Sequence, residues 1–343
     1  MPVDVSTMDD RVAKIEKSYK NKVFKGSDYD NPERIPFESP VLNWASGGGV
    51  PQGRFTRIFG HWSAGKSRTT WGVIAEAQRM GKKCIYYNIE KQYNIGHAEE
   101  VGVDVDELEV IQTSRIEEVG AICEELLNSA HVHVFDSCSA ASSIDALGAD
   151  VEDWQRGLKA RAWNKVMDRL TDKIDDVENT IIYIDQVRVN QQTHQEEPPG
   201  GKAMEHDSSL TIQLRRAKWL FRNNKGNLTD DSKGTRASNT FSRSMEPDGI
   251  EIVARVVKSR VGRPNRTALM RLDYRDMMFD KAFEIARAGV DLGIIDQKGA
   301  WYYVDAGRSK PEKFNGIDNL QLYVAEDADL QEEIMKRLLK SNR

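Results

Sequence analysis

An eight-residue phosphate-binding signature constrains this chain more than any other feature of its sequence. Residues 60–67 read GHWSAGKS, which matches the pattern G-x-x-x-x-G-K-[ST]. The segment RFTRIF before it has the character of a strand, and TTWGVIAEAQRM after it has that of a helix. A strand, a glycine-containing loop and a helix in this order direct backbone N–H groups toward phosphate oxygens. The signature therefore predicts a nucleoside triphosphate site.

The residue types in this loop explain the expected chemistry. Gly60 and Gly65 permit positive φ angles, so successive N–H groups can curve around the β- and γ-phosphates. Lys66 supplies a positive charge, and the Ser67 hydroxyl is a ligand for Mg²⁺. A glycine-rich turn with a solvated lysine is the alternative, and the flanking strand and helix favour the phosphate site. The predicted nucleotide-binding residues of this segment are Gly60, Ser63, Ala64, Gly65, Lys66, Ser67 and Arg68.

Composition excludes several other classes of protein. The 343 residues are 39% hydrophobic and 30% charged, and no apolar run is long enough to cross a bilayer. The N-terminus is charged and has no apolar signal region, so we expect a cytoplasmic protein. Cys84, Cys123 and Cys138 are widely spaced, which favours reduced thiols over disulfides or zinc. Because the net charge is -5, any binding of nucleic acid must be local.

Hydrophobic periodicity predicts an α/β fold with a mainly parallel sheet. Expected strands and helices alternate from residue 54 onward, over 56–59, 69–80, 84–89, 116–129, 132–135, 157–174 and 180–184. Such alternation is typical of parallel strands covered by helices, with ligand loops at the carboxyl ends of the strands. We expect three parts: an N-terminal helical arm over 1–35, a core over 36–275 and a small α+β domain over 276–343.

Two long polar segments interrupt this pattern. Residues 190–201 contain QQTHQEEPPGG, and a loop of this length inside a compact domain is usually functional or disordered. Residues 223–249 have the character of a surface insertion between SLTIQLRRAKWLF and the expected strand IEIVARVV.

Three polar side chains follow expected strands and should meet the phosphate loop at the carboxyl edge of the sheet. Asp136, after VHVF, has the position of a Walker B carboxylate that holds Mg²⁺ directly or through water, with a helix cap as the alternative. Glu90, after CIYYNI, could accept the proton of an attacking water, or could be a surface residue that starts a helix. Gln186, after TIIYID, could hydrogen-bond the γ-phosphate and signal to the adjoining polar segment.

Taken together, these blocks resemble the RecA family of recombinases, of bacterial or phage type, over nearly the whole chain. The shared blocks, in order, include IEKSYK, GGGVPQGRFTRIFG, GKSRTT, YYNIEK, VFDSCSAA, YIDQVR, PPGGKAM, VVKSRVGRP and ARAGVDLGIIDQKGAWYY. The last block distinguishes the chain from hexameric helicases with the same core. The resemblance implies a RecA-like P-loop NTPase core, an N-terminal arm used in oligomerisation and a small C-terminal α+β domain.

The resemblance also implies an activity. Members of this family use ATP and Mg²⁺ to form a helical filament on single-stranded DNA, pair it with homologous double-stranded DNA and exchange strands. DNA stimulates their ATP hydrolysis, and no membrane is involved. Lys258 and Arg260 match a pair that the family places on the neighbouring subunit's γ-phosphate, although a basic strand edge is the alternative. The catalytic residues implied are Glu90, Lys66, Gln186, Lys258 and Arg260.

The family places two DNA-binding loops inside the filament. The first lies near residues 149–157, where a basic cluster at an expected helix start opposes the helix dipole, so that a polyanion would relieve the cost. A solvated helix face is the alternative. The second is the 190–201 segment, in which Glu196 and Glu197 are unfavourable for DNA. The predicted DNA-binding residues are Arg156, Lys159, Arg161, Arg188, Gly200, Gly201 and Lys202.

Some positions depart from the family pattern. Trp62 replaces a residue that is usually acidic, and Arg68 replaces a second hydroxyl. His97 occupies the position of a tyrosine that stacks on adenine, and His206 stands at an interface position that is usually aromatic. We interpret the chain as a divergent member. A ring-type translocase or helicase and a non-hydrolysing regulatory filament protein are the alternative functions.

Overall fold

The computed structural model describes residues 6–18, 32–144, 155–177, 179–189, 196–197, 201–223, 226–229, 246–304 and 311–341. The chain divides into two compact units, Met1–Glu33 and Arg34–Arg343. Helix α1 (Ser6–Ser18) belongs to the first unit, and it confirms the helix expected near the N-terminus. The described part of the chain contains no helix with the length and apolarity of a membrane span.

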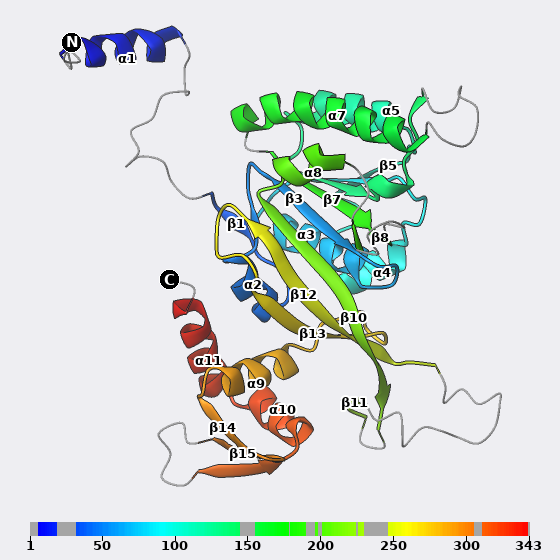
Figure 1. Ribbon diagram of the computed structural model, residues 1–343. Coiled ribbons are helices and arrows are strands. Elements are labelled where there is room, and N and C mark those ends of the chain that lie inside the picture. The colour runs from blue at the N-terminus through cyan, green and yellow to red at the C-terminus, as the bar shows by residue number, and fades with distance from the viewer. Residues whose placement is uncertain are drawn as a thin grey trace. The chain divides into compact units, whose positions relative to one another are not determined.

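A nine-stranded sheet, counted over the described residues, forms the centre of the second unit (Figure 1). Its order is β13-β12-β10-β3-β7-β6-β4-β5, with β11 paired to β10. The six strands from β10 to β5 run parallel, whereas β12 and β13 are antiparallel, which confirms the predicted mainly parallel sheet. The bounds are β3 (Phe55–Gly60), β4 (Cys84–Asn88), β5 (Leu108–Ile111), β6 (Val132–Asp136), β7 (Thr180–Gln186), β10 (Leu210–Arg222), β11 (Leu228–Thr229), β12 (Gly249–Ser259) and β13 (Thr267–Asp273).

Helices cover both faces of this sheet. One face packs against α2 (Pro40–Ser46), α3 (Lys66–Arg79) and α4 (Ile95–Val101), and the other against α5 (Ile116–Leu126), α7 (Gln155–Val177) and α8 (Gly201–Asp207). Neighbouring residues of one strand enter different cores, as Tyr86 and Tyr87 of β4 show. Because both faces are buried, the central strands read as continuous apolar runs, which is why the sequence identified them.

A buried ion pair joins the two strands at the middle of the sheet. Nε and Nη2 of Arg57 on β3 donate hydrogen bonds to Oδ2 of Asp185 on β7, over 2.9 and 2.6 Å. Each side chain is 1% exposed. Asp185 directly precedes Gln186, and Arg57 lies three residues before the start of the phosphate loop, so the pair holds the strands that carry both features.

The C-terminal elements form a small α+β layer of the kind predicted. Helix α9 (Lys281–Asp291) is followed by an antiparallel sheet of β14 (Ile295–Lys298), β15 (Trp301–Val304) and β16 (Glu312–Asn315), then by α10 (Ile317–Glu326) and α11 (Ala328–Lys340). One apolar core runs from these elements into α2 and the large sheet. The boundary expected at residue 275 stays a prediction.

A buried carboxyl group joins this layer to α2. Oε2 of Glu284, on α9, accepts a 2.7 Å hydrogen bond from the hydroxyl of Ser39, the N-cap residue of α2. Burial raises the pKa of Glu284 to about 8, and the hydrogen bonds from Ser39 and the Val41 N–H oppose that rise. Glu284 therefore holds a proton in the folded chain at a pH where the unfolded chain has lost it.

Replacing this carboxyl group should change how stability depends on pH. Because the folded chain binds the Glu284 proton more tightly, its free energy of unfolding should fall as pH rises from about 4.5 to about 8. One unit of pKa difference between the folded and unfolded chains corresponds to about 1.4 kcal/mol. Glu284→Gln should be more stable than the wild type at pH 8.5 and close to it at pH 4.5. Urea unfolding at several pH values measures this, and parallel curves for the two proteins would contradict it.

Candidate nucleotide-binding site

The phosphate loop connects β3 to α3, as the sequence predicted. Gly65 has φ +80° and is the residue before the first turn of α3, and Ser63 has φ +54°. A Cβ on Gly60 would lie 2.1 Å from the Leu214 carbonyl oxygen of β10, and one on Gly65 would lie 2.8 Å from Ile252. A side chain at either position would therefore collide with a neighbouring strand, so both positions require glycine. The loop has the shape of an anion cradle at a helix N-terminus.

Lys66 places its ammonium group within this cradle. Its Nζ donates a 2.7 Å hydrogen bond to the carbonyl oxygen of His61, across the loop. The side chain is buried, and burial lowers its pKa, while the nearby carboxylates of Asp136 and Glu90 oppose this change. A partly desolvated cation next to helix N–H groups is a strong site for phosphate oxygens.

The two residues predicted to hold Mg²⁺ contact each other. Asp136 ends β6, and its carboxylate accepts hydrogen bonds from the hydroxyls of Ser67 and Tyr86, the latter over 2.6 Å. Burial raises the pKa of Asp136, and both hydrogen bonds oppose that rise. The described residues contain no cluster of three or more His, Cys, Asp or Glu side chains with metal-ligand geometry. These residues fit a Mg²⁺ ion whose remaining ligands are phosphate oxygens and water.

Glu90 and Gln186 lie together at the carboxyl edge of the sheet. Nε2 of Gln186, at the end of β7, donates a 2.7 Å hydrogen bond to Oε1 of Glu90, which follows β4. The Ser137 hydroxyl donates to the same oxygen, and the backbone N–H of Gln186 donates to the Ser139 hydroxyl over 2.8 Å. Topology thus brings together two residues that are 96 positions apart in the sequence.

Sequence reasoning missed three residues of this network. Tyr86, Ser137 and Ser139 each hydrogen-bond a predicted site residue. The signal for the serines was present, because VFDSCSAA places both directly after the Walker B carboxylate. Tyr86 gave no such signal, because a tyrosine within an apolar run is expected to pack in the core like its neighbours in a buried strand.

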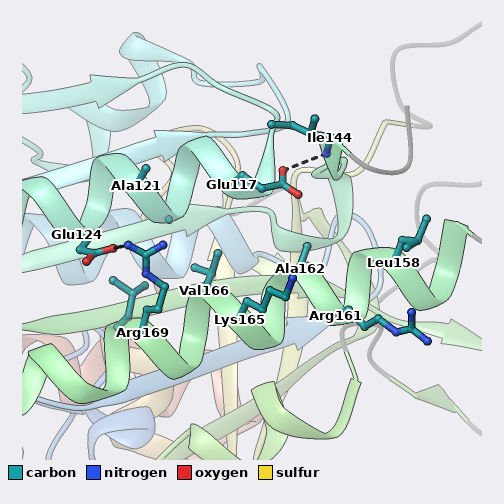
Figure 2. Close-up of a pocket in the computed structure, with 12 residues that line it drawn as sticks. Glu117, Ala121, Glu124, Ile144, Leu158, Arg161, Ala162, Lys165, Val166 and Arg169 are labelled. Carbon is teal, nitrogen blue, oxygen red and sulfur yellow. Dashed lines mark hydrogen bonds and ion pairs between the residues drawn. The ribbon is translucent and has the colours of Figure 1, made fainter. Parts of the chain in front are cut away.

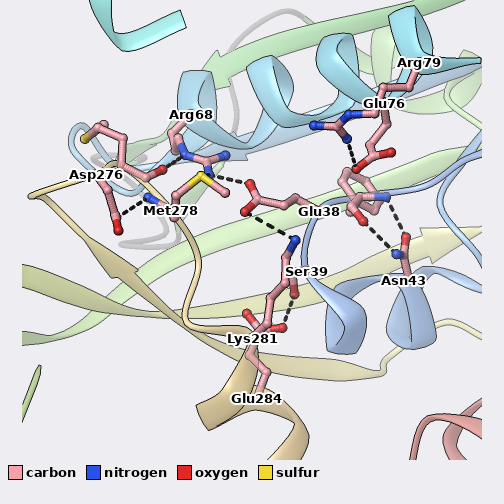
Figure 3. Close-up of polar contacts among 12 residues, drawn as sticks. Glu38, Ser39, Asn43, Arg68, Glu76, Arg79, Asp276, Met278, Lys281 and Glu284 are labelled. Carbon is pink, nitrogen blue, oxygen red and sulfur yellow. Dashed lines mark hydrogen bonds and ion pairs between the residues drawn. The ribbon is translucent and has the colours of Figure 1, made fainter. Parts of the chain in front are cut away.

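Contact of Arg68 with the nucleotide stays a prediction, and its side chain has other partners. Its guanidinium group turns away from the loop, pairs with Glu38 and donates to the carbonyl oxygen of Met277 (Figure 3). Its carbon CZ also lies 4.7 Å from the centre of the Phe279 ring. The physical reason is charge, because a buried cation in the first turn of a helix opposes the helix dipole and needs a carboxylate partner.

Two other predicted departures lie near the loop. The Trp62 side chain is 72% exposed. His97 is an exposed residue of α4, and its ring centre lies 6.4 Å from that of Trp71 on α3. Contact of His97 with a base stays a prediction.

Lys258 and Arg260 hold the end of helix α8. Nζ of Lys258 donates to the carbonyl oxygens of Glu205 and His206, over 2.6 and 2.9 Å, and Nη2 of Arg260 donates to that of His206 over 2.6 Å. Cations at the C-terminal carbonyls of a helix also interact favourably with its dipole. Burial and the neighbouring Arg260 charge lower the pKa of Lys258. Both predicted cations therefore donate to the same group, the carbonyl oxygens at the end of α8. Contact with a neighbouring subunit stays a prediction.

The first group of predicted DNA-binding residues lies on α7. Arg161 is exposed and, with Lys165 and Arg169, borders a groove of about 410 Å³ between α5 and α7 (Figure 2). Lys159 is partly buried on the same helix. Arg156 belongs to the first turn, and its side chain lies outside the described residues.

The second group frames the 190–201 segment. Strand β8 (Arg188–Val189) pairs antiparallel with β9 (Glu196–Glu197), with Arg188 opposite Glu197 and Val189 opposite Glu196. This pairing places the backbone of both glutamates in a short strand, which the sequence did not predict. Gly201 and Lys202 begin α8, whereas Gly200 lies outside the described residues, as do the side chains of Arg188 and Lys202.

A mainly parallel sheet, a phosphate loop after β3 and polar residues at the ends of β4, β6 and β7 define a P-loop nucleotide-binding α/β protein. The RecA N-terminal domain family model matches residues 6–279. Protein RecA of Desulfovibrio desulfuricans is 31% identical over 340 residues, covering 96% of this chain and 87% of that protein. Protein RecA of Phytoplasma mali is 29% identical over 344 residues, covering 96% and 94%. The chain belongs to the RecA family, which confirms the resemblance found in its sequence.

Replacing Glu90 should separate nucleotide binding from hydrolysis. Glu90→Gln keeps a side chain of the same size but cannot accept a proton, so kcat for ATP hydrolysis should fall by about 10²-fold or more, with little change in ATP affinity. Phosphate release and equilibrium binding measure the two quantities. Glu100→Gln, at an exposed position of α4, is the matched control and should retain activity. A Glu90→Gln protein with wild-type kcat would exclude Glu90 as the base.

Proposed function

We propose that this chain is an ATP-dependent homologous recombinase. It would form a filament on single-stranded DNA, pair that strand with homologous duplex DNA and exchange strands, with hydrolysis of ATP stimulated by DNA. The hydrogen bond from Gln186 to Glu90 carries the proposal most directly, because Gln186 ends β7 just before the 190–201 segment. Membership of the RecA family supports the same function.

The chemistry would be divided among residues of one subunit as follows. The N–H groups of the loop and the Lys66 ammonium would bind the triphosphate. Ser67 and Asp136 would hold Mg²⁺, which neutralises charge on the phosphate oxygens when bound. Glu90 would accept a proton from the attacking water. Oε1 of Glu90 accepts hydrogen bonds from Ser137 and Gln186, so a γ-phosphate that draws Gln186 away would leave only the Ser137 bond and open one acceptor position for the water.

Gln186 and α8 would connect the nucleotide to DNA. Gln186 lies just before the 190–201 segment, and α8, whose C-terminal carbonyl oxygens accept hydrogen bonds from Lys258 and Arg260, begins at its end. Arg188 and Lys202 would supply charge to DNA phosphates there, while Arg156, Lys159 and Arg161 would do so from α7. Such binding should be sensitive to salt and largely independent of base sequence.

A pair of measurements tests this function. We expect ATP hydrolysis to increase when single-stranded DNA is added, and strand exchange to require homology between the strand and the duplex. Lys66→Ala should abolish both activities, because the cradle loses its cation. Unwinding of a forked duplex without homology would instead indicate a ring-type translocase. Filaments that form without hydrolysis would indicate the regulatory protein to which Trp62 and His206 point.

Lys258 should act on the site of a neighbouring subunit. Lys258→Ala should lose DNA-stimulated hydrolysis while the isolated chain still binds ATP, since its own phosphate loop is intact. Mixing Lys258→Ala with Glu90→Gln in equal amounts should restore roughly a quarter of the wild-type rate, because each interface of a head-to-tail filament takes the two groups from different subunits.

A second mixture is the control for this experiment. Glu90→Gln mixed with Lys66→Ala should remain inactive beyond the sum of the separate proteins, because both residues belong to the same subunit's site. Failure of the first mixture to recover any activity, with both variants in one filament, would exclude action of Lys258 on a neighbour.

A further inference from the structure

The Arg68 side chain leaves the phosphate site and enters a buried cluster that no role in nucleotide binding explains. Arg68 is the residue after Ser67, in the first turn of α3. Its guanidinium is 3% exposed and pairs with the Glu38 carboxylate, whose side chain is 6% exposed. Figure 3 shows the two groups facing each other between α3 and the chain before α2. Nζ of Lys281, on α9, lies 3.9 Å from the other Glu38 oxygen.

The guanidinium group also holds the connection between β13 and α9, residues 274–280. Its Nε donates to the carbonyl oxygen of Met277, and Nη2 lies 3.8 Å from the sulfur of Met278. Met277 has φ +54°, a left-handed conformation that is uncommon outside glycine. The guanidinium carbon also lies over the ring of Phe279, 4.7 Å from its centre. One arginine thus contacts three consecutive residues of this connection.

The next turn of α3 makes room for this arrangement. A Cβ at Gly72 would lie 3.2 Å from Nη1 of Arg68 and 3.6 Å from the Glu38 carboxylate. A Cβ at position 72 would make a tight contact with the guanidinium group, which would have to shift by a few tenths of an ångström. The small residue at position 72 therefore leaves room for the Arg68 guanidinium group beside Glu38.

We propose that Arg68 is a positioning residue that couples nucleotide binding at the phosphate loop to the connection between β13 and α9. Nucleotide held by Lys66 and Ser67 fixes the backbone of the first turn of α3. Arg68, the residue after Ser67, donates a hydrogen bond to the Met277 carbonyl oxygen. Binding of the nucleotide therefore also restrains residues 274–280 and the start of the C-terminal layer. The coupling rests on the nucleotide site proposed above, and it is reciprocal, so that a loosened connection weakens nucleotide binding by the same factor.

The test is hydrogen exchange of the full-length chain with and without a non-hydrolysable ATP analogue and Mg²⁺. In the wild type, the analogue should slow exchange both in the phosphate loop and in residues 274–284, where the Asp280 N–H donates to the Arg271 carbonyl oxygen. In Arg68→Met/Glu38→Leu, slowing over 274–284 should fall below about twofold while that in the loop persists. The dissociation constant of the analogue should rise by roughly fivefold or more.

The double substitution replaces a buried ion pair by apolar side chains of similar size, which usually preserves folding. Its matched control is Arg271→Met/Glu251→Leu. That pair is also buried, with side chains 8% and 7% exposed, and Arg271 also stacks on an aromatic ring, that of Phe283. It does not involve α3. Because Arg271 contacts Phe283 within 274–284, basal exchange there should rise, but the Arg68 contact with Met277 remains, so the slowing caused by the nucleotide should be retained. If the first double variant does not fold, Gly72→Ala should reduce the same effect by crowding the guanidinium group.

The outcomes are distinguishable. A wild-type chain that binds the analogue but shows no slowing over 274–284 would overturn the coupling and leave the proposed function intact. The same holds if the slowing survives in the Arg68 variant. A wild-type chain that does not bind the analogue at all would overturn the proposed function, and the coupling with it.

Discussion

The buried ion pair between Arg57 and Asp185 is the interaction on which the site depends. It joins β3 to β7 in a register that places Gly60 opposite Gln186. The start of the phosphate loop and the proposed sensor of the γ-phosphate therefore lie at the same height on the sheet. Removing either charge would leave the other buried and uncompensated, at a cost of about 3–5 kcal/mol. The pair thus ties the geometry of the site to the stability of the sheet.

Around this pair, the site is assembled from short side chains at the ends of parallel strands. Asp136, Glu90 and Gln186 end or directly follow three adjacent strands, and hydroxyl groups connect them to one another and to the phosphate loop. Burial makes each charge expensive unless a partner is present, which explains why Lys66 and Asp136 have pKa values displaced toward their neutral forms. A bound triphosphate with its cation would supply the missing countercharges, so the site is preorganised for that ligand.

Three cationic side chains that the sequence assigned to phosphate groups contact backbone carbonyl oxygens of other segments in the folded chain. Lys258 on β12 and Arg260 just after it reach the end of α8, and Arg68 reaches the connection before α9. In each case the guanidinium or ammonium group meets backbone carbonyl oxygens of a segment distant in sequence. Arg68 thereby joins the first turn of α3 to the connection before the C-terminal layer, and Lys258 and Arg260 join the end of β12 to α8.

The sequence by itself determined the phosphate loop, most of the strands and helices between residues 56 and 184, and the three polar residues that follow those strands. These features are local, because a loop motif, an apolar run and the residue after it are all read within a few positions. Only the tertiary structure decided that Gln186 bonds Glu90, that Tyr86 bonds Asp136 and that Arg68 leaves the nucleotide site for Glu38. Strands β5 and β13 and helices α2, α4 and α10 were also not predicted. The reason is physical: the partner of a buried polar group is chosen by which strands are neighbours and by desolvation, and neither is visible in residues adjacent along the chain.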